Sequence, residues 1–335
     1  MTESVAINSH RYQRWTDRPI RRRWAWPAIT AAGVRLANKG NRTRGLVWMS
    51  LGFALLSCGL FYVLAQLEIL AGTPEAAGLY EFVKTILGVD LSGVSRLAEF
   101  REVLWRSAFL FLFKAELYWA FLVAAFAGPG LIADDLKARA LPIYFARPVT
   151  PFSYLLGKVM VIAFFVSLAI LLSNLLGLIF GVIVTGGLAT TAQTIRLGLD
   201  LLLCGGAATL FMGVLMLALS SMSSDKRYVT VGWVAVGVLP MMVQAILLEQ
   251  LPREATSRWL GSISLYGDIA VLTEWWFGIS QAWATTPLPR EAFREALGRG
   301  TDPVYPGVVL LAIAVASVWF CYRRVLKFSR SAANV

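Results

Sequence analysis

The chain has 335 residues, of which 57% are hydrophobic and 15% charged, whereas ordinary soluble domains carry about 25% charged residues. The apolar residues fall in long runs rather than in alternating or amphipathic patterns, which excludes a soluble globular domain. The formal net charge of +11 could indicate nucleic-acid binding, but the basic residues lie at the ends of apolar runs and form no single patch. Composition therefore predicts an all-α membrane protein that binds lipid and no nucleic acid.

The first 45 residues form a basic tail with ten Lys or Arg, ahead of the first long apolar run. Within this tail, Trp24, Trp26 and Ile29 lead into a stretch ending at Lys39, and Leu36 returns to the face of Ile29 one heptad later. Such a pattern is typical of a helix lying at the membrane interface, although a plain basic tail is the alternative. The apolar run that follows is too long for a signal-peptide core and is expected to stay as a membrane anchor.

Six apolar stretches reach the length of about 20 residues that a helix needs to cross a bilayer. They are Leu46–Leu67, Ser107–Ala127, Tyr154–Val184, Leu197–Leu219, Val229–Leu248 and Pro306–Tyr322. Six spans place both termini on one side of the membrane. That side then carries twenty Lys and Arg and the other side ten, so the positive-inside rule predicts cytoplasmic termini.

Two long connections lie on the predicted outer side. Residues 68–106 mix acidic and basic residues and are expected to form short surface helices. Residues 249–305 contain an apolar, aromatic stretch from Leu260 to Trp283 that is interrupted by Asp268 and Glu274. Because a carboxylate in the bilayer is costly, we expect a re-entrant or surface-lying element there rather than a seventh span.

The cytoplasmic segment between the second and third spans, residues 128–158, reads GPGLIADDLKARALPIYFARPVTPFSYLLGK. Its Gly-Pro-Gly start is expected to break the helix that leaves the membrane. A short polar helix should follow, which Pro142 is expected to end near Leu141. Thr150 and Pro151 are a good N-cap and first-turn pair, so the third span should begin there. A braced element of this kind can transmit force from a soluble partner, whereas the alternative is an ordinary inside loop.

The segment also resembles a known family. The order Gly-Pro, Ile-Ala-Asp-Asp-Leu, Ala-Leu-Pro-Ile-Tyr, Ala-Arg-Pro-Val-Thr and Tyr-Leu-Leu-Gly-Lys is similar to the cytoplasmic region of ABC-2 type transporter permeases. The similarity is greatest to the branch of permeases from gliding-motility and copper-processing operons. The resemblance implies a transmembrane domain like that of type V exporters, in which six spans follow a cytoplasmic connecting helix. It also implies that the loop between spans two and three is a coupling helix that docks on an ATPase.

By this resemblance the chain is the permease subunit of an ATP-driven transporter in the bacterial inner membrane. The implied partners are a second permease copy, in a homodimer or heterodimer, and two ATPase subunits that hold ATP and magnesium. The implied organisation is a basic tail with the connecting helix at 1–45, a six-helix permease domain at 46–322 and a basic tail at 323–335. The resemblance places six residues of the coupling segment, 129–152, at the ATPase: Asp134, Asp135, Lys137, Arg139, Arg147 and Pro148.

The sequence lacks the residues that several kinds of chemistry require. No Walker A pattern, G-x4-GK[ST], occurs, so the chain is not expected to hydrolyse ATP itself or to carry a cofactor. The only histidine, His10, lies in the basic tail, which excludes histidine-based zinc sites and a Ser-His-Asp triad inside the membrane. An ATPase-independent channel or secondary transporter, a carboxylate-only membrane enzyme and a membrane scaffold are the alternatives to the permease.

Two further groups of residues inside the spans are candidates for a role. Lys114 and Glu116 are the most costly residues to place in lipid, and two apart they point to different helix faces. They either line a path or contact a neighbouring subunit, or Lys114 snorkels outward, which is the interpretation we favour. Small residues at close-packing spacing predict internal helix packing or a dimer interface. They are Ser173, Gly177 and Gly181, and Gly205, Gly206 and Gly213.

Overall fold

The computed structural model describes residues 24–87, 97–145, 149–188, 190–250, 263–279 and 302–333. Within these ranges every regular element is a helix. Six stretches are long and apolar enough to cross a membrane: Thr43–Ile69, Arg101–Lys137, Pro151–Thr185, Thr191–Met222, Lys226–Leu247 and Val304–Lys327. They coincide in position with the six predicted spans. For the described residues, the predictions of an all-helical fold and of six membrane-length helices are therefore confirmed, and these six helices indicate a multi-pass membrane protein.

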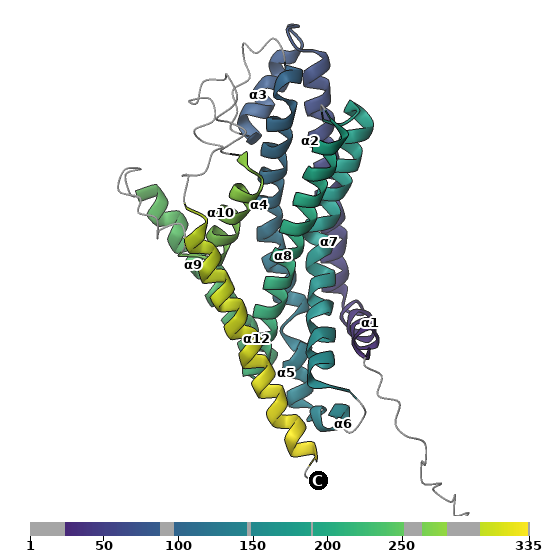
Figure 1. The fold of residues 1–335 in the computed structure, drawn as a ribbon, viewed down its shortest axis with the longest axis vertical. Helices are drawn as coiled ribbons and strands as arrows, with labels where there is room; N and C mark the ends of the chain where they lie inside the picture. The colour runs from purple at the N-terminus through teal and green to yellow at the C-terminus, as the bar shows by residue number, and fades with distance from the viewer. Residues whose placement is uncertain are drawn as a thin grey trace, which may run out of the picture.

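The long helices form a bundle that is drawn upright in Figure 1. They are α2 (Asn41–Ile69), α4 (Arg101–Ala127), α7 (Pro151–Thr185), α8 (Thr191–Met222), α9 (Lys226–Gln250) and α12 (Val304–Ala333). The shorter elements are α1 (Trp26–Ala37), α3 (Ala76–Leu87), the 3-10 helix η1 (Leu97–Phe100), α5 (Gly130–Lys137), α6 (Leu141–Phe145) and α10 (Leu265–Trp276). Helices α1, α5, α6 and the end of α12 lie at the same end of the bundle, which we call the lower end (Figure 1).

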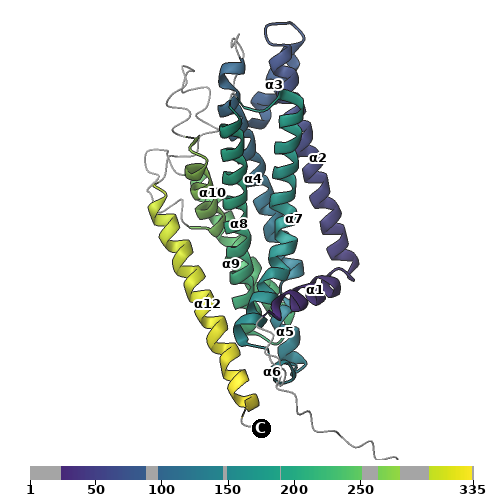
Figure 2. The ribbon, with the colours of Figure 1, turned by 45° about the vertical axis from the view of Figure 1, so that its right-hand side comes forward.

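Helix α7 is the centre of the bundle, because it packs against α1, α2, α4, α8 and α12. Helices α2, α4, α7 and α8 run side by side, and α12 leans away from them towards the upper end (Figures 1 and 2). Buried side chains gather in two clusters. One, towards the lower end, includes Tyr154, Met216 and Trp233. The other, towards the upper end, includes Phe61 and Trp105, whose ring centroids are 5.2 Å apart.

The N-terminal helix α1 crosses α7 near the lower end (Figure 2). Thr30 Oγ1 donates a hydrogen bond to the carbonyl oxygen of Gly157 at 3.0 Å. Gly157 permits this close approach, since a Cβ there would lie 2.8 Å from the Cβ of Ile29. Of the two alternatives for this stretch, a helix is found rather than a plain tail. Leu36 does not share the packed face of Ile29, because its side chain is 71% exposed.

The two long connections that are predicted to lie on the outer side both contain short helices. In the first, Ala76 and Val83 of α3 are buried, so this helix packs on the bundle. In the second, α10 has twelve residues and is about 18 Å long, too short to cross a bilayer. Helix α10 contacts α4, α8, α9 and α12, and Asp268 is 1% exposed. Helix α10 therefore packs against the neighbouring helices through one face, while Trp275 and Trp276 at its end are exposed, and no helix in the described part of this connection is long enough for a seventh span.

Ion pairs connect the helices at the upper end. Arg101 of α4 pairs with Glu68 of α2 and donates to the carbonyl oxygen of Gly187 at 2.8 Å. Arg106, also of α4, donates to the carbonyl oxygen of Phe277 at 2.7 Å, just beyond the end of α10. These contacts join α2, α4, α10 and the turn after α7 at the end opposite to α5 and α6.

Candidate functional site

The segment that resembles a coupling helix folds as two short helices at the lower end, α5 and α6, which we call the α5–α6 element (Gly130–Phe145). Helix α5 ends at Lys137, and Arg139 then takes a left-handed backbone conformation with φ of 50°. Helix α6 begins at Leu141 with Pro142 in its first turn, where the missing N–H of proline costs no helical hydrogen bond. The prediction that Pro142 ends a helix near Leu141 is therefore wrong, since Pro142 begins the next one.

The break between α4 and α5 is held by Ser220 of α8, whose side chain is fully buried. Ser220 Oγ donates to the carbonyl oxygen of Pro129 at 2.7 Å and accepts the backbone N–H groups of Ile132 at 3.0 Å and Ala133 at 3.2 Å. The first N–H groups of a helix have no partner within the helix. One hydroxyl has one donor and two acceptor positions, so Ser220 uses its whole hydrogen-bonding capacity at this break.

Close packing at Gly128 brings the same break against α8. A Cβ at Gly128 would lie 2.2 Å from the Cγ of Met216, so no larger residue fits there without a shift. The predicted helix break at Gly-Pro-Gly is present, because α4 ends at Ala127 and α5 begins at Gly130. The α5–α6 element is thus joined to α8 by packing and by hydrogen bonds.

Asp135 joins the α5–α6 element to α7. Its Oδ2 accepts a hydrogen bond from the Tyr154 hydroxyl at 2.6 Å and lies 2.7 Å from Lys158 Nζ. Lys158 Nζ also lies 5.5 Å from the centre of the Tyr154 ring. The side chains of Asp135 and Lys158 are 16% and 11% exposed, so this ion pair is mostly shielded from water. Removing one member would leave the other charge without a partner in a place where water compensates poorly.

Aromatic side chains extend this contact to α6. The rings of Tyr144 and Phe145 lie 5.6 Å and 5.9 Å from the ring of Tyr154. Burial, and then the Asp135 carboxylate, raise the pKa of Tyr144 above its usual value. Thr150 Oγ1 accepts the N–H of Ser153 at 3.2 Å, so the predicted N-cap at the start of the third span is present. Both short helices are therefore fixed to the first turns of α7.

The six residues assigned to ATPase contact by resemblance have different environments. Three are exposed on the α5–α6 element or in its turn: Asp134, Lys137 and Arg139. Asp135 instead faces α7, where Lys158 and Tyr154 occupy its carboxylate. Arg147 and Pro148 lie outside the described residues. The surface available to a partner is therefore formed by the first three, and Asp135 is an internal link.

Sequence reasoning missed three residues that hold this element: Tyr154, Lys158 and Ser220. A lysine two turns into an apolar span, as Lys158 is in α7, was a signal that a buried acidic partner is needed. Ser220 gave no such signal, because a serine in an apolar helix is common and its partners are 87 to 91 residues away.

The two polar residues of the second span have separate partners. Lys114 Nζ lies 3.6 Å from Glu274 Oε2 of α10, so its charge has an acidic partner within the chain. Glu116 is fully buried, and its Oε2 accepts a hydrogen bond from Asn174 Nδ2 of α7. Within the described residues, Glu116 Oε1 and Asn174 Oδ1 have no hydrogen-bond partner. The two side chains thus contact different neighbouring helices within one chain.

The small residues of α7 lie where other helices come closest. Ser173 is fully buried, and a Cβ at Gly177 would lie 2.0 Å from Ser57 Oγ of α2. A Cβ at Gly181 would lie 3.0 Å from the Trp105 ring of α4. These contacts are internal to the bundle.

The second group of small residues, in α8, includes two glycines that lie close to α7 and one that does not. A Cβ at Gly205 would lie 2.5 Å from Leu171 Cδ2, and one at Gly213 would lie 3.3 Å from Val159 Cγ1, both in α7. Nothing lies within 4 Å of a Cβ at Gly206. Of the two predictions for this group, internal packing therefore applies to Gly205 and Gly213 and not to Gly206, for which a dimer interface stays a prediction.

No family model matches the chain, and no curated protein matches it either. In the part of the chain that the structure describes, no three His, Cys, Asp or Glu side chains gather closely enough to hold a metal ion. The role of residues 128–158 as a coupling region, which the resemblance implies, therefore stays a prediction.

Proposed function

We propose that this chain is the membrane-spanning permease subunit of an ATP-binding cassette transporter of the ABC-2 type, which exports a substrate while a separate ATPase hydrolyses ATP. Three observations support the proposal. Residues 128–158 resemble the coupling region of that family, six helices have membrane length, and α5 and α6 lie at the same end as α1 and the end of α12. The charge distribution favours the cytoplasm for that end.

The observation that carries the proposal is the double attachment of the α5–α6 element. Its exposed surface presents charged side chains, while its inner surface is bonded to α7 through Asp135 and to α8 through Ser220. A force applied by a docked ATPase would therefore reach two spans at once. Such a rigid element fits a mechanism in which ATPase closure rotates helices and switches the path between inward-facing and outward-facing states.

The proposed complex contains a second permease copy and two ATPase subunits, which hold the ATP and magnesium. Helices α9 and α12 leave apolar faces uncovered, since only 22% of each membrane-length window is buried within the chain. In the proposed complex, lipid and the second copy cover these faces. This chain contributes no covalent chemistry.

The test uses charge reversal on the exposed surface. Asp134→Lys and Lys137→Glu are expected to abolish co-purification of the ATPase from native membranes, or to uncouple its ATP turnover from transport. Glu81→Lys is the matched control, because Glu81 is also exposed and on a short helix but lies on α3 at the upper end. Full ATPase association and coupling in both reversed variants would refute the proposal. Transport by the purified chain without any ATPase would favour a channel or secondary transporter instead.

A further inference from the structure

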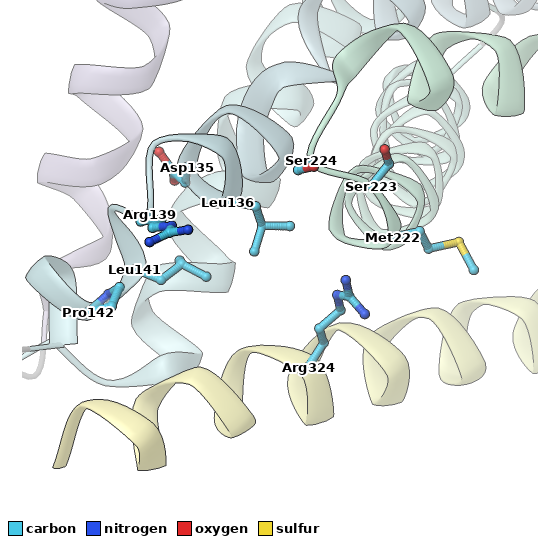
Figure 3. Close-up of a pocket in the computed structure, with 9 residues that line it drawn as sticks. All are labelled: Asp135, Leu136, Arg139, Leu141, Pro142, Met222, Ser223, Ser224 and Arg324. Carbon is cyan, nitrogen blue, oxygen red and sulfur yellow. The ribbon is translucent and has the colours of Figure 1, made fainter. Parts of the chain in front are cut away.

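A cavity of about 610 Å³ lies beside the α5–α6 element at the lower end (Figure 3). Its walls come from the α5–α6 element, from the turn between α8 and α9, and from α12 (Figure 3). Apolar side chains form much of the wall, among them Leu136, Leu141 and Met222. The cavity thus lies where segments far apart in sequence meet, outside the hydrogen bonds that join α5 to α7 and α8.

Two guanidinium groups border this cavity from opposite walls, Arg139 from the turn after α5 and Arg324 from α12 (Figure 3). Among the described residues, no ion pair involves either of them. The Nε of Arg324 is buried and has no hydrogen-bond partner there. Asp135 also lines the cavity, but Lys158 already neutralises its carboxylate. The cavity therefore carries a net positive charge that the described residues do not balance.

A phosphate group supplies the hydrogen-bond acceptors and the negative charge that these arginines lack. The planar guanidinium donates two parallel hydrogen bonds to phosphate oxygens, and a buried donor without an acceptor is costly. The Ser224 hydroxyl, which also lines the cavity and is exposed, can donate to the same group. Two arginines that border one space from opposite sides are better explained by an anion held between them than by two independent surface charges.

The location of the cavity indicates which phosphate it receives. On α12, Trp319 is 55% exposed and Arg323 lies 4.2 Å from the centre of its ring. An exposed tryptophan beside an arginine at the end of an apolar span is typical of the boundary between lipid and water. A headgroup at this depth brings a glycerol and the first acyl carbons with it, and the apolar wall can pack against them.

We propose that this cavity binds the headgroup of an anionic phospholipid, with Arg139 and Arg324 holding the phosphate from opposite sides and the apolar wall holding the glycerol region. The bound lipid adds a second connection between α12 and the α5–α6 element, which already meet directly where α12 packs against α6. The site depends on the lipid alone and does not require that an ATPase docks on the chain.

The test measures lipid binding to the purified full-length protein in detergent. Native mass spectrometry with added phosphatidylglycerol or phosphatidylcholine gives the affinity for each lipid, and we expect tighter binding of phosphatidylglycerol. Arg139→Gln and Arg324→Gln should each weaken phosphatidylglycerol binding by about fivefold, the effect of one basic residue at an anionic membrane surface. Arg323→Gln is the matched control, because Arg323 adjoins Arg324 and stacks on Trp319 without lining the cavity. It should leave that affinity nearly unchanged.

Three results would overturn the proposal. Equal affinity for the two lipids would exclude a site for anionic headgroups. Equal losses in the Arg323 control and the cavity variants would indicate a general charge effect. If inorganic phosphate displaced the lipid at equal concentration, the cavity would be a site for free phosphate instead. Arg139 is exposed, so its variant tests the site even if Arg324→Gln fails to fold.

Discussion

The ion pair between Asp135 and Lys158 allows a direct test of how the α5–α6 element is attached to α7. The replacement Asp135→Asn keeps an oxygen that can accept a hydrogen bond from the Tyr154 hydroxyl, and Lys158→Met keeps the unbranched apolar stem of the side chain without its ammonium group. Each single variant therefore removes the charge of one partner and little else. In each case the remaining charge stays in a site where its side chain is less than a fifth exposed.

The expected magnitude follows from this burial. Breaking a fully buried ion pair costs about 3–5 kcal/mol, and partial exposure of both side chains lowers this to about 2–3 kcal/mol for each single variant. The double variant leaves no unpaired charge, so it should cost no more than either single variant. The coupling free energy, the sum of the two single costs less the double cost, is therefore at least about 2–3 kcal/mol. If the chain is a permease as proposed, the same variants should also weaken the link between ATP hydrolysis and transport, while the ATPase still binds to the exposed surface.

The measurement is equilibrium unfolding in mixed micelles, followed by tryptophan fluorescence, for the wild type, both single variants and the double variant. Single-variant costs that add within about 0.5 kcal/mol would refute the reasoning, because they would mean that the two charges do not interact. A gain in stability on loss of Lys158 alone would refute it as well.

Three further predictions concern the bundle itself and use the same unfolding measurement. Ser220→Ala should cost at least about 2 kcal/mol, because two buried N–H groups lose their acceptor. Gly177→Ala should destabilise the bundle by about 1–3 kcal/mol through overpacking against α2, whereas Gly206→Ala should be neutral or slightly stabilising. Glu116→Gln should be tolerated, because its amide oxygen can still accept from Asn174, whereas Glu116→Ala should cost about 2 kcal/mol by removing one of the two acceptors of Asn174 Nδ2, which then keeps only the carbonyl oxygen of Ile170.

For each of these three predictions, one outcome would contradict the physical reason given. An unchanged stability of Ser220→Ala would mean that another group or water holds the break between α4 and α5. Equal effects at Gly177 and Gly206 would mean that the close approach of α2 to α7 is relaxed in the membrane. Equal tolerance of glutamine and alanine at position 116 would mean that its bond to Asn174 contributes nothing.

The six membrane-length helices could be predicted because each needs only its own residues. A run of about 20 apolar residues satisfies its backbone internally whatever lies next to it, so the spans follow from the local sequence. The cap at Thr150 and the break at Gly-Pro-Gly are local for the same reason. Five of the six predicted spans agree with their helices to within six residues at each end, whereas α12 continues to Ala333, eleven residues beyond the predicted end at Tyr322.

The contacts that make up the candidate site are not local. Ser220 meets Pro129 across 91 residues, and nothing in the neighbourhood of either residue specifies the other. Pro142 was wrongly predicted to end a helix, because proline occurs both after the end of one helix and in the first turn of the next. Only the left-handed turn at Arg139 decides between these two positions. The cavity combines α12 with α5, so its two arginines could be associated only after the helices were placed.

The short length of α10 has a consequence for the order in which the protein assembles. A twelve-residue helix carrying Asp268 and Glu274 has too little apolar length to enter lipid alone, and its ends would expose backbone polar groups to hydrocarbon. Lys114 on α4 supplies the charge opposite Glu274 and, through its carbonyl oxygen, accepts from Tyr266. We therefore expect α10 to join the bundle only after α4 is in place, because Lys114 of α4 provides these polar contacts.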